Sequence, residues 1–147
     1  MAGKQEIRTG DAPAPAGSYS QGLVAGDFLY TAGVGPIDPR TGEVAGDDVA
    51  TQTRQVLENL RAILAARGLT FDSVVKATVH LQDLRRDFAA YDAVYRSYFT
   101  PPFPVRTTVG SDLMNILVEI DLLNIGASVG QQVPNLFDTH ELQYLAA

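Results

Sequence analysis

The stretch FPVRTTVGSDLMNILVEIDLLN, residues 103–124, constrains the fold of this chain more than any other. Residues 104–109 and 115–123 each alternate between two kinds of side chain, as strands do when only one face is buried. The second run has an unbroken apolar face, made of Ile116, Val118, Ile120 and Leu122. Because Gly110-Ser111-Asp112 between the runs has the composition of a turn, the stretch predicts an antiparallel hairpin.

The predicted hairpin carries an arginine on one strand and two carboxylates on the other. Arg106 shares a face with Thr108, while Glu119 and Asp121 share the face opposite the apolar one. Alternation leaves two interpretations of the arginine open. Arg106 either forms a structural ion pair with Glu119 or Asp121, or lies on a solvated face. In the other interpretation it clamps a substrate carboxylate while Glu119 handles a proton or a water.

Length and composition indicate one globular domain that acts without nucleic acid or membrane. The chain has 147 residues, of which 46% are hydrophobic and 19% charged, enough for a real core. Its net charge of −6, with no basic cluster larger than Arg85-Arg86, argues against a nucleic-acid partner. No apolar run reaches the roughly 20 residues of a membrane span, and the first residues do not resemble a signal peptide, so we expect a cytoplasmic protein.

The supply of reactive side chains narrows the chemistry further. The chain has no cysteine, and its two histidines, His80 and His140, are far apart in the sequence. A thiolate nucleophile is therefore excluded, and a metal site made of protein ligands is not expected. Any reaction has to use oxygen, amide and guanidinium groups.

The first third of the chain predicts an arm followed by short strands. Residues 1–17 are polar and rich in Pro and Ala, so we expect a mobile arm with at most an edge strand at residues 5–8. Strands are predicted at residues 23–24 and 28–31. Gly33 and Gly35 then leave the backbone bare, which suits either a bend or a close approach of backbone N–H groups to a ligand.

Two one-sided helices and a strand fill the middle of the chain. Asp48 can cap a helix over residues 49–67, which Gly68 ends and whose outer side we expect to hold Arg54, Glu58, Asn59 and Arg61. Residues 73–81 alternate as a strand. Asp87 can cap the second helix, whose aromatic stripe we interpret as core: Phe88, Tyr91, Tyr95 and Tyr98.

This order of elements predicts a mixed sheet with both helices on one face. The other face is then left without a cover from this chain. We expect it to carry Lys76, Thr78, His80, Arg106, Thr108, Glu119 and Asp121. A symmetric oligomer packed through that face is the simplest cover, and it would put Arg106 near a subunit boundary.

A series of segments in this order resembles the RidA (YjgF, reactive intermediate deaminase) family. They are APAPAGSYSQG, FLYTAG, IDPRTGEV, QTRQVLENLRAIL, ARGLTFDSVVKATVHLQDL, DFAAYDAVYRSYF, FPVRTTV and VEIDLL, over roughly residues 7–124. The resemblance implies one α+β, chorismate-mutase-like domain over residues 1–124, followed by an extension over residues 125–147. It also implies a homotrimer built around a barrel of sheets, with three clefts between subunits.

The resemblance implies an activity as well. RidA proteins hydrolyse reactive enamines and imines, such as 2-aminoacrylate and its 2-imino acid tautomer, to 2-keto acids and ammonia, without a metal or an organic cofactor. The arginine of the family's FPxR motif falls on Arg106 and its C-terminal strand glutamate on Glu119. The tyrosine of its PYxQ-like segment falls on Tyr19, and the glycine that ends its TSG-like strand falls on Gly33. Arg106 would hold the substrate carboxylate with the Gly33 N–H, Glu119 would deprotonate water, and Tyr19 would border the pocket.

The chain departs from the family pattern around the implied substrate site. Ala32 stands where serine is frequent, Asp92 where asparagine is common, and Thr108 where cysteine is frequent. The turn between Arg106 and Glu119 is about two residues shorter than in standard members. These departures indicate a divergent member, so two alternatives stay open: a biosynthetic enzyme of the same fold that acts on another imine or pathway intermediate, and a non-catalytic trimer that binds carboxylates.

Overall fold

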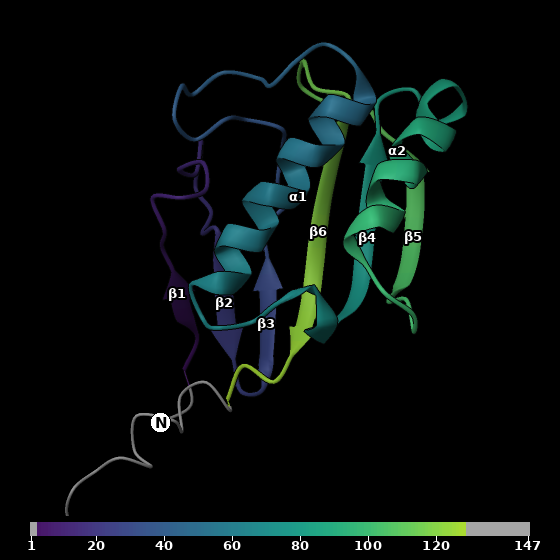
Figure 1. The fold of residues 1–147 in the computed structure, drawn as a ribbon. Helices are drawn as coiled ribbons and strands as arrows, with labels where there is room; N and C mark the ends of the chain where they lie inside the picture. Colours follow the sequence, from purple (N-terminus) through teal and green to yellow (C-terminus); the bar gives the residue numbers. More distant parts are fainter. Residues whose placement is uncertain (1–2, 129–147) are drawn as a thin grey trace, which may run out of the picture.

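The computed structural model describes residues 3–128, which form one six-stranded mixed sheet with both helices on the same face (Figure 1). This confirms the predicted α+β architecture. The strands are β1 (Gln5–Ile7), β2 (Gly22–Ala25), β3 (Phe28–Thr31), β4 (Val74–Leu81), β5 (Val105–Gly110) and β6 (Val118–Ile125), and the helices are α1 (Val49–Ala65) and α2 (Leu84–Tyr98). Their order in the sheet is β1-β2-β3-β6-β4-β5. Nearly all of the predicted extension, from residue 129 on, lies outside the described residues.

The predicted cap of the first helix is confirmed, and that of the second is wrong. The Asp48 carboxylate accepts a hydrogen bond from the Thr51 N–H at 2.9 Å, which starts α1 as expected. Helix α2 begins one turn earlier than predicted, because Asp83 accepts from the Arg86 N–H at 3.1 Å. Asp87 instead lies in the first turn, where its charge suits the helix dipole.

Asn59 lies in the interior, not on the outer side of α1 where the sequence placed it. Its side chain is only 1% exposed, and its amide donates to the carbonyl oxygens of Gly35 at 3.1 Å and Ile37 at 2.8 Å. The loop after β3 therefore passes over α1 and hides this polar residue. Helical periodicity could not show this, because it does not say which loop covers a polar position.

We expect Asn59→Ala to lower the free energy of unfolding by about 1–3 kcal/mol, because the partly buried carbonyl groups of Gly35 and Ile37 lose their donor. Urea unfolding measures the change. Arg54→Ala, on the exposed side of the same helix, is the matched control and should stay within about 0.5 kcal/mol of the parent. Equal effects of the two substitutions would contradict a structural role for the Asn59 amide.

Strands β5 and β6 are not neighbours, so the predicted hairpin is wrong. Strand β5 pairs in parallel with β4, and β6 lies between β3 and β4, antiparallel to both. The first reason is that α2 connects β4 to β5, and a helical crossover brings the chain back parallel. The second is that the apolar face of β6, with Val118, Ile120 and Leu122, is fully buried only in the middle of the sheet.

The pairing of β5 also decides which face its side chains take. Arg106 lies opposite Ala77 and Thr108 opposite Val79, and both of these β4 residues are fully buried under the helices. Arg106 and Thr108 therefore lie on the helix-covered face, and their predicted place on the uncovered face is wrong. A strand's neighbour and register set its faces, and neither can be read from alternation alone.

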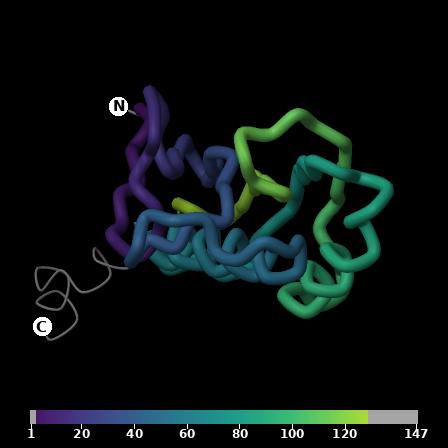
Figure 2. The backbone as a smooth tube through the Cα atoms, turned by 90° about the horizontal axis from the view of Figure 1, so that it is seen from above, coloured from purple at the N-terminus to yellow at the C-terminus, as the bar shows by residue number. Residues whose placement is uncertain are grey.

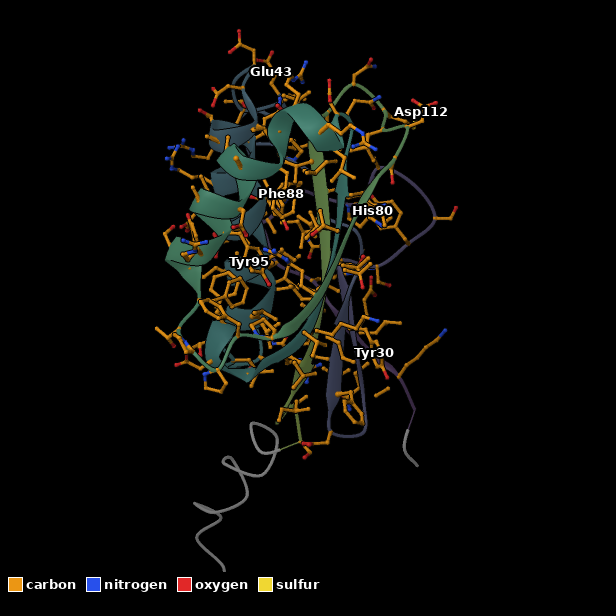
Figure 3. The ribbon with its side chains drawn as sticks, turned by 90° about the vertical axis from the view of Figure 1, so that its right-hand side faces the viewer. Tyr30, Glu43, His80, Phe88, Tyr95 and Asp112 are labelled. Atoms are coloured by element: carbon orange, nitrogen blue, oxygen red, sulfur yellow. The ribbon has the colours of Figure 1, made fainter. Side chains whose placement is uncertain are left out.

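The face turned away from the helices, which we call the open face, is not covered by a helix among residues 3–128. Figure 3 shows the sheet from its edge, with His80 and Tyr30 on the open face and Tyr95 on the helix side. From the register, the open face carries the remaining members of the predicted polar set, Lys76, Thr78, His80, Glu119 and Asp121. It also exposes large apolar side chains, Phe28, Tyr30, Val105, Val109 and Ile125.

The segment predicted as an N-terminal arm is tied to the sheet. Residues 5–7 form the edge strand β1, and Ile7 and Ala12 are buried. The Gln21 side chain binds the arm at four places: its amide donates to the carbonyls of Thr9, Ala12 and Pro13, and its oxygen accepts from the Thr9 N–H. Seen from above, this part of the chain and the loop after β5 both stand on the side of the sheet away from the helices (Figure 2).

No helix of the described residues is long and apolar enough to cross a membrane.

Candidate active site

Arg106 lies half-buried between β5 and α2, in contact with a carboxylate and three aromatic rings. Its Nη1 donates to Asp92 Oδ1 at 2.7 Å. The centre of its guanidinium lies 4.7 Å from the ring centroid of Tyr95, 5.4 Å from that of Tyr91 and 5.8 Å from that of Phe88. Cation–π contacts of this kind contribute about 0.5–2 kcal/mol each. The predicted ion pair of Arg106 with Glu119 or Asp121 is therefore wrong, and its counter-ion is Asp92 on α2.

The hollow beside Arg106 has a volume of about 370 Å³ and is lined by Asp92, Tyr95, Arg96, Phe103, Pro104 and Arg106. Partial burial is the largest single influence and lowers the pKa of Arg106. The hydrogen bond that Arg106 donates to Asp92 and the electrostatic effects of Asp92, Tyr91 and Tyr95 together outweigh burial, so this pKa lies above its ordinary value. Arg96 Nη2 lies 3.3 Å from the other oxygen of Asp92, Oδ2. The sequence did not single out Arg96, although its spacing of four residues from Asp92 on one helix is the signal that could have found it.

The tyrosines of the aromatic stripe combine core packing with polar contacts at this site. Tyr91 and Tyr95 are buried, as predicted for core residues, and the Tyr91 hydroxyl is 2.8 Å from Thr108 Oγ1. Burial raises the pKa of Tyr95 to about 12, so its hydroxyl stays protonated at neutral pH. That hydroxyl is buried and has no hydrogen-bond partner among the described residues. The Thr108 hydroxyl, two residues along β5 from Arg106, is therefore already hydrogen-bonded to Tyr91 of α2.

Glu119 lies on the open face next to a stretch of bare backbone. Val34 and Ile120 exchange two backbone hydrogen bonds, 2.8 and 3.1 Å long, which hold the segment after β3 against the start of β6. A methyl group at Gly33 would collide with the Glu119 carboxylate, so only glycine lets the two come this close. Gly33 thus has the close-approach role that the sequence left open, with a protein carboxylate as the group that approaches.

A second hollow, of about 400 Å³, opens beside Gly33 and brings Tyr19, Ala32 and Gly33 together. Tyr19 is 51% exposed, and its hydroxyl accepts a hydrogen bond from the Ala16 N–H at 2.9 Å. The loop that carries Tyr19 is fixed by Gln21, whose amide holds the preceding segment. Tyr19, Ala32 and Gly33 are therefore close to one another in the fold, and Glu119 lies at Gly33.

Asp121 neighbours Glu119 on the open face but has a different environment. It pairs with Thr78 on β4, and burial raises its pKa above the ordinary value, an effect that His80 and Lys76 partly offset. Nδ1 of His80 lies 2.7 Å from Ser111 Oγ, so the imidazole is engaged with the loop after β5. Asp121 is therefore held among cationic and polar side chains of the same sheet.

One copy of the chain keeps its two halves of the predicted site apart. Strand β4 lies between β5 and β6, so these two strands are about 10 Å apart across the sheet. Arg106 lies opposite Ala77 of β4 and Glu119 lies opposite His80, and these two β4 positions are another ~10 Å apart along the strand. Their side chains also lie on opposite faces of the sheet. Arg106, Asp92 and Thr108 form what we call the arginine half, and Tyr19, Ala32, Gly33 and Glu119 form what we call the glutamate half.

Among residues 3–128, no group of three or more His, Asp or Glu side chains is placed to hold a metal ion. The polar groups of the two halves are a guanidinium, two carboxylates, a threonine hydroxyl, a phenol and backbone N–H groups. Together they can bind an anion and move a proton.

Comparison with known proteins places the chain in a family. The family model described as Endoribonuclease L-PSP matches residues 9–125. A RutC family protein of Pyrococcus horikoshii is 46% identical over 122 residues, which are 82% of this chain and 96% of that protein. The 2-iminobutanoate/2-iminopropanoate deaminase of Escherichia coli is 45% identical over 106 residues, which are 70% of this chain and 81% of the deaminase.

The fold agrees with solved structures of similar proteins. The crystal structure of E. coli TdcF with bound serine has a TM-score of 0.77 and 35% sequence identity to this chain, and the match covers 82% of this chain and 98% of TdcF. The family model covers well over half of the sequence, and the relatives are more than 40% identical over 70% or more of it. The chain therefore belongs to the RidA (YjgF) family, whose model carries the description Endoribonuclease L-PSP.

Proposed function

We propose that this protein hydrolyses small 2-imino acids and their enamine tautomers to 2-keto acids and ammonia. The observation that carries the proposal is the pair of incomplete halves, one with a guanidinium for a carboxylate and the other with a carboxylate for a water. The similarity to an imine deaminase of E. coli supports the reaction, and the serine bound in TdcF supports a small ligand with a carboxylate. A nucleic-acid substrate is not favoured, since the net charge is −6.

The complete site needs a second copy of the chain, because no single copy can bring Arg106 to Glu119. The open face carries Glu119 together with exposed apolar side chains such as Phe28 and Tyr30, which a partner would bury. A cyclic oligomer of the kind implied for the family, a homotrimer, would set the arginine half of one copy against the glutamate half of the next. Each cleft then has Arg106 from one copy and Glu119 from the next.

In this arrangement the reaction needs orientation and one proton carrier. Arg106 holds the substrate carboxylate through its planar fork of N–H donors, so the imine carbon next to it has a fixed position. Glu119 accepts a proton from a water as the water oxygen bonds to the imine carbon, and it passes this proton to the imine nitrogen, which gives a neutral carbinolamine. Glu119 then takes the proton of the carbinolamine hydroxyl and delivers a proton to the nitrogen. The C–N bond breaks as the C=O bond forms, and ammonia and the 2-keto acid leave. The Gly33 backbone lies beside Glu119 and can border the reacting atoms.

The direct test generates 2-iminobutanoate and 2-iminopropanoate in situ with an amino-acid oxidase and follows their decay with and without the protein. We expect faster decay and an equal yield of 2-keto acid and ammonia. Solution mass measured on the same sample should be that of a trimer. A stable monomer at micromolar concentration would remove the shared site, and a decay rate equal to the buffer control would remove the deaminase function.

A further inference from the structure

The guanidinium that would hold the substrate carboxylate is already bound to a carboxylate of its own chain. Asp92 Oδ1 accepts from Arg106 Nη1 at 2.7 Å, while Asp92 Oδ2 lies 3.3 Å from Arg96 Nη2. The side chains of Asp92 and Arg106 are 21% and 25% exposed, so water screens this pair only partly, whereas that of Arg96 is 72% exposed. Asp92 thus bridges an inner and an outer arginine at the mouth of one hollow.

We propose that Asp92 is a specificity-determining residue that competes with the ligand for Arg106 and limits the site to ligands with one carboxylate. The proposal rests on the proposed function only in that a ligand carboxylate binds Arg106. For a ligand carboxylate to accept from both Nη1 and Nη2 of Arg106, Asp92 has to release Nη1 and keep only its contact with Arg96. Arg96 is then the residue that receives the displaced carboxylate.

The charges around the hollow give the reason for the limit. Its lining contains two guanidinium groups and one carboxylate, and its other members, Tyr95, Phe103 and Pro104, carry no charge at neutral pH. The net charge is therefore +1, which one ligand carboxylate neutralises. A second ligand carboxylate would find no unpaired cation among these lining residues, because Arg96 is paired with Asp92, and it would be repelled by Asp92.

The test measures the equilibrium binding of two stable 2-keto acids, 2-oxobutanoate with one carboxylate and 2-oxoglutarate with two, by calorimetry on the full-length protein. Asp92→Asn keeps the shape of the side chain and removes its charge. We expect it to tighten 2-oxobutanoate binding about tenfold, and 2-oxoglutarate binding by a larger factor, because like-charge repulsion acts on both ligand carboxylates. Asp47→Asn, at an exposed position before α1, makes the same change of net charge and should leave both affinities within about twofold.

Arg96→Gln tests where the displaced carboxylate goes. With Arg96 gone, Asp92 has only Arg106 as a partner, so 2-oxobutanoate should bind about threefold more weakly. In the Asp92→Asn background, Arg96→Gln should change the logarithm of the Kd for 2-oxobutanoate by less than half as much as it does in the parent. The reason is that this background has no displaced carboxylate for Arg96 to bind. An equal loss in both backgrounds would overturn the role of Arg96.

The outcomes separate this inference from the deaminase function. Tighter binding by Asp92→Asn is a gain that mere structural damage does not produce. Unchanged or weaker binding of 2-oxobutanoate by Asp92→Asn would overturn the competition, even if the parent hydrolyses imines. If neither the parent nor Asp92→Asn binds 2-oxobutanoate, the competition is overturned as well. A parent protein that hydrolyses no imine, with binding that still tightens in Asp92→Asn, would overturn the proposed function and leave the competition standing.

Discussion

Glu119→Gln is expected to slow the hydrolysis of 2-iminobutanoate by about 10² or more, the usual scale for the loss of a general base. The amide keeps the shape of the side chain beside Gly33 but cannot take a proton from water. The initial rate of imine decay measures the effect. Since Glu119 is partly exposed on the open face and outside the core, the unfolding temperature should change little.

The matched control is Asp121→Asn, two residues along the same face of β6. Asp121 lies opposite Thr78 and near Lys76 and His80 of β4, while Glu119 is the carboxylate that contacts Gly33. We therefore expect the control to lower the rate less than about threefold. A larger loss from Asp121→Asn than from Glu119→Gln would assign the proton transfer to Asp121, and little effect from either would remove β6 from the chemistry.

Arg106→Lys should largely abolish imine hydrolysis while the protein stays folded. Lysine keeps the positive charge, so its pairing with Asp92 can persist, but it lacks the planar fork that binds a carboxylate through two N–H groups and stacks on Tyr95. The ratio kcat/KM and the circular dichroism spectrum measure the two effects separately. Activity within about threefold of the parent, less than 1 kcal/mol of transition-state free energy, would show that Arg106 is not the clamp.

The same two variants test whether the site is shared between copies. Inactive Arg106→Lys and Glu119→Gln proteins are unfolded together and refolded at equal concentration, so that the copies mix. In a cyclic oligomer with shared clefts, a cleft that takes Arg106 from one variant and Glu119 from the other is intact, and about one quarter of the parent activity should return. Separately refolded samples, mixed afterwards without exchange, are the control. No recovery in the mixed oligomer would place both groups in the cleft of a single copy.

The local patterns of this sequence determined its elements well. Alternation in β4 and β6 predicted their buried faces, with Ala77 and Ile120 fully buried. Asp48 predicted the start of α1, because a cap depends on a residue and the backbone three positions on. Arg106 and Glu119 were predicted as candidate functional residues, because such charges are rare inside strands and costly to leave unpaired.

Tertiary structure alone decided which strands pair and which charges meet. The helical crossover through α2 made β5 parallel to β4, which moved Arg106 to the helix side and gave it Asp92 as its counter-ion, 14 residues away in sequence. The loop over α1 buried Asn59 in the same way. Periodicity records only whether a side chain faces an apolar or a polar environment, and neighbours far along the chain supply that environment. Local sequence patterns therefore specify the elements and their apolar faces, while long-range packing specifies the partners of the polar residues.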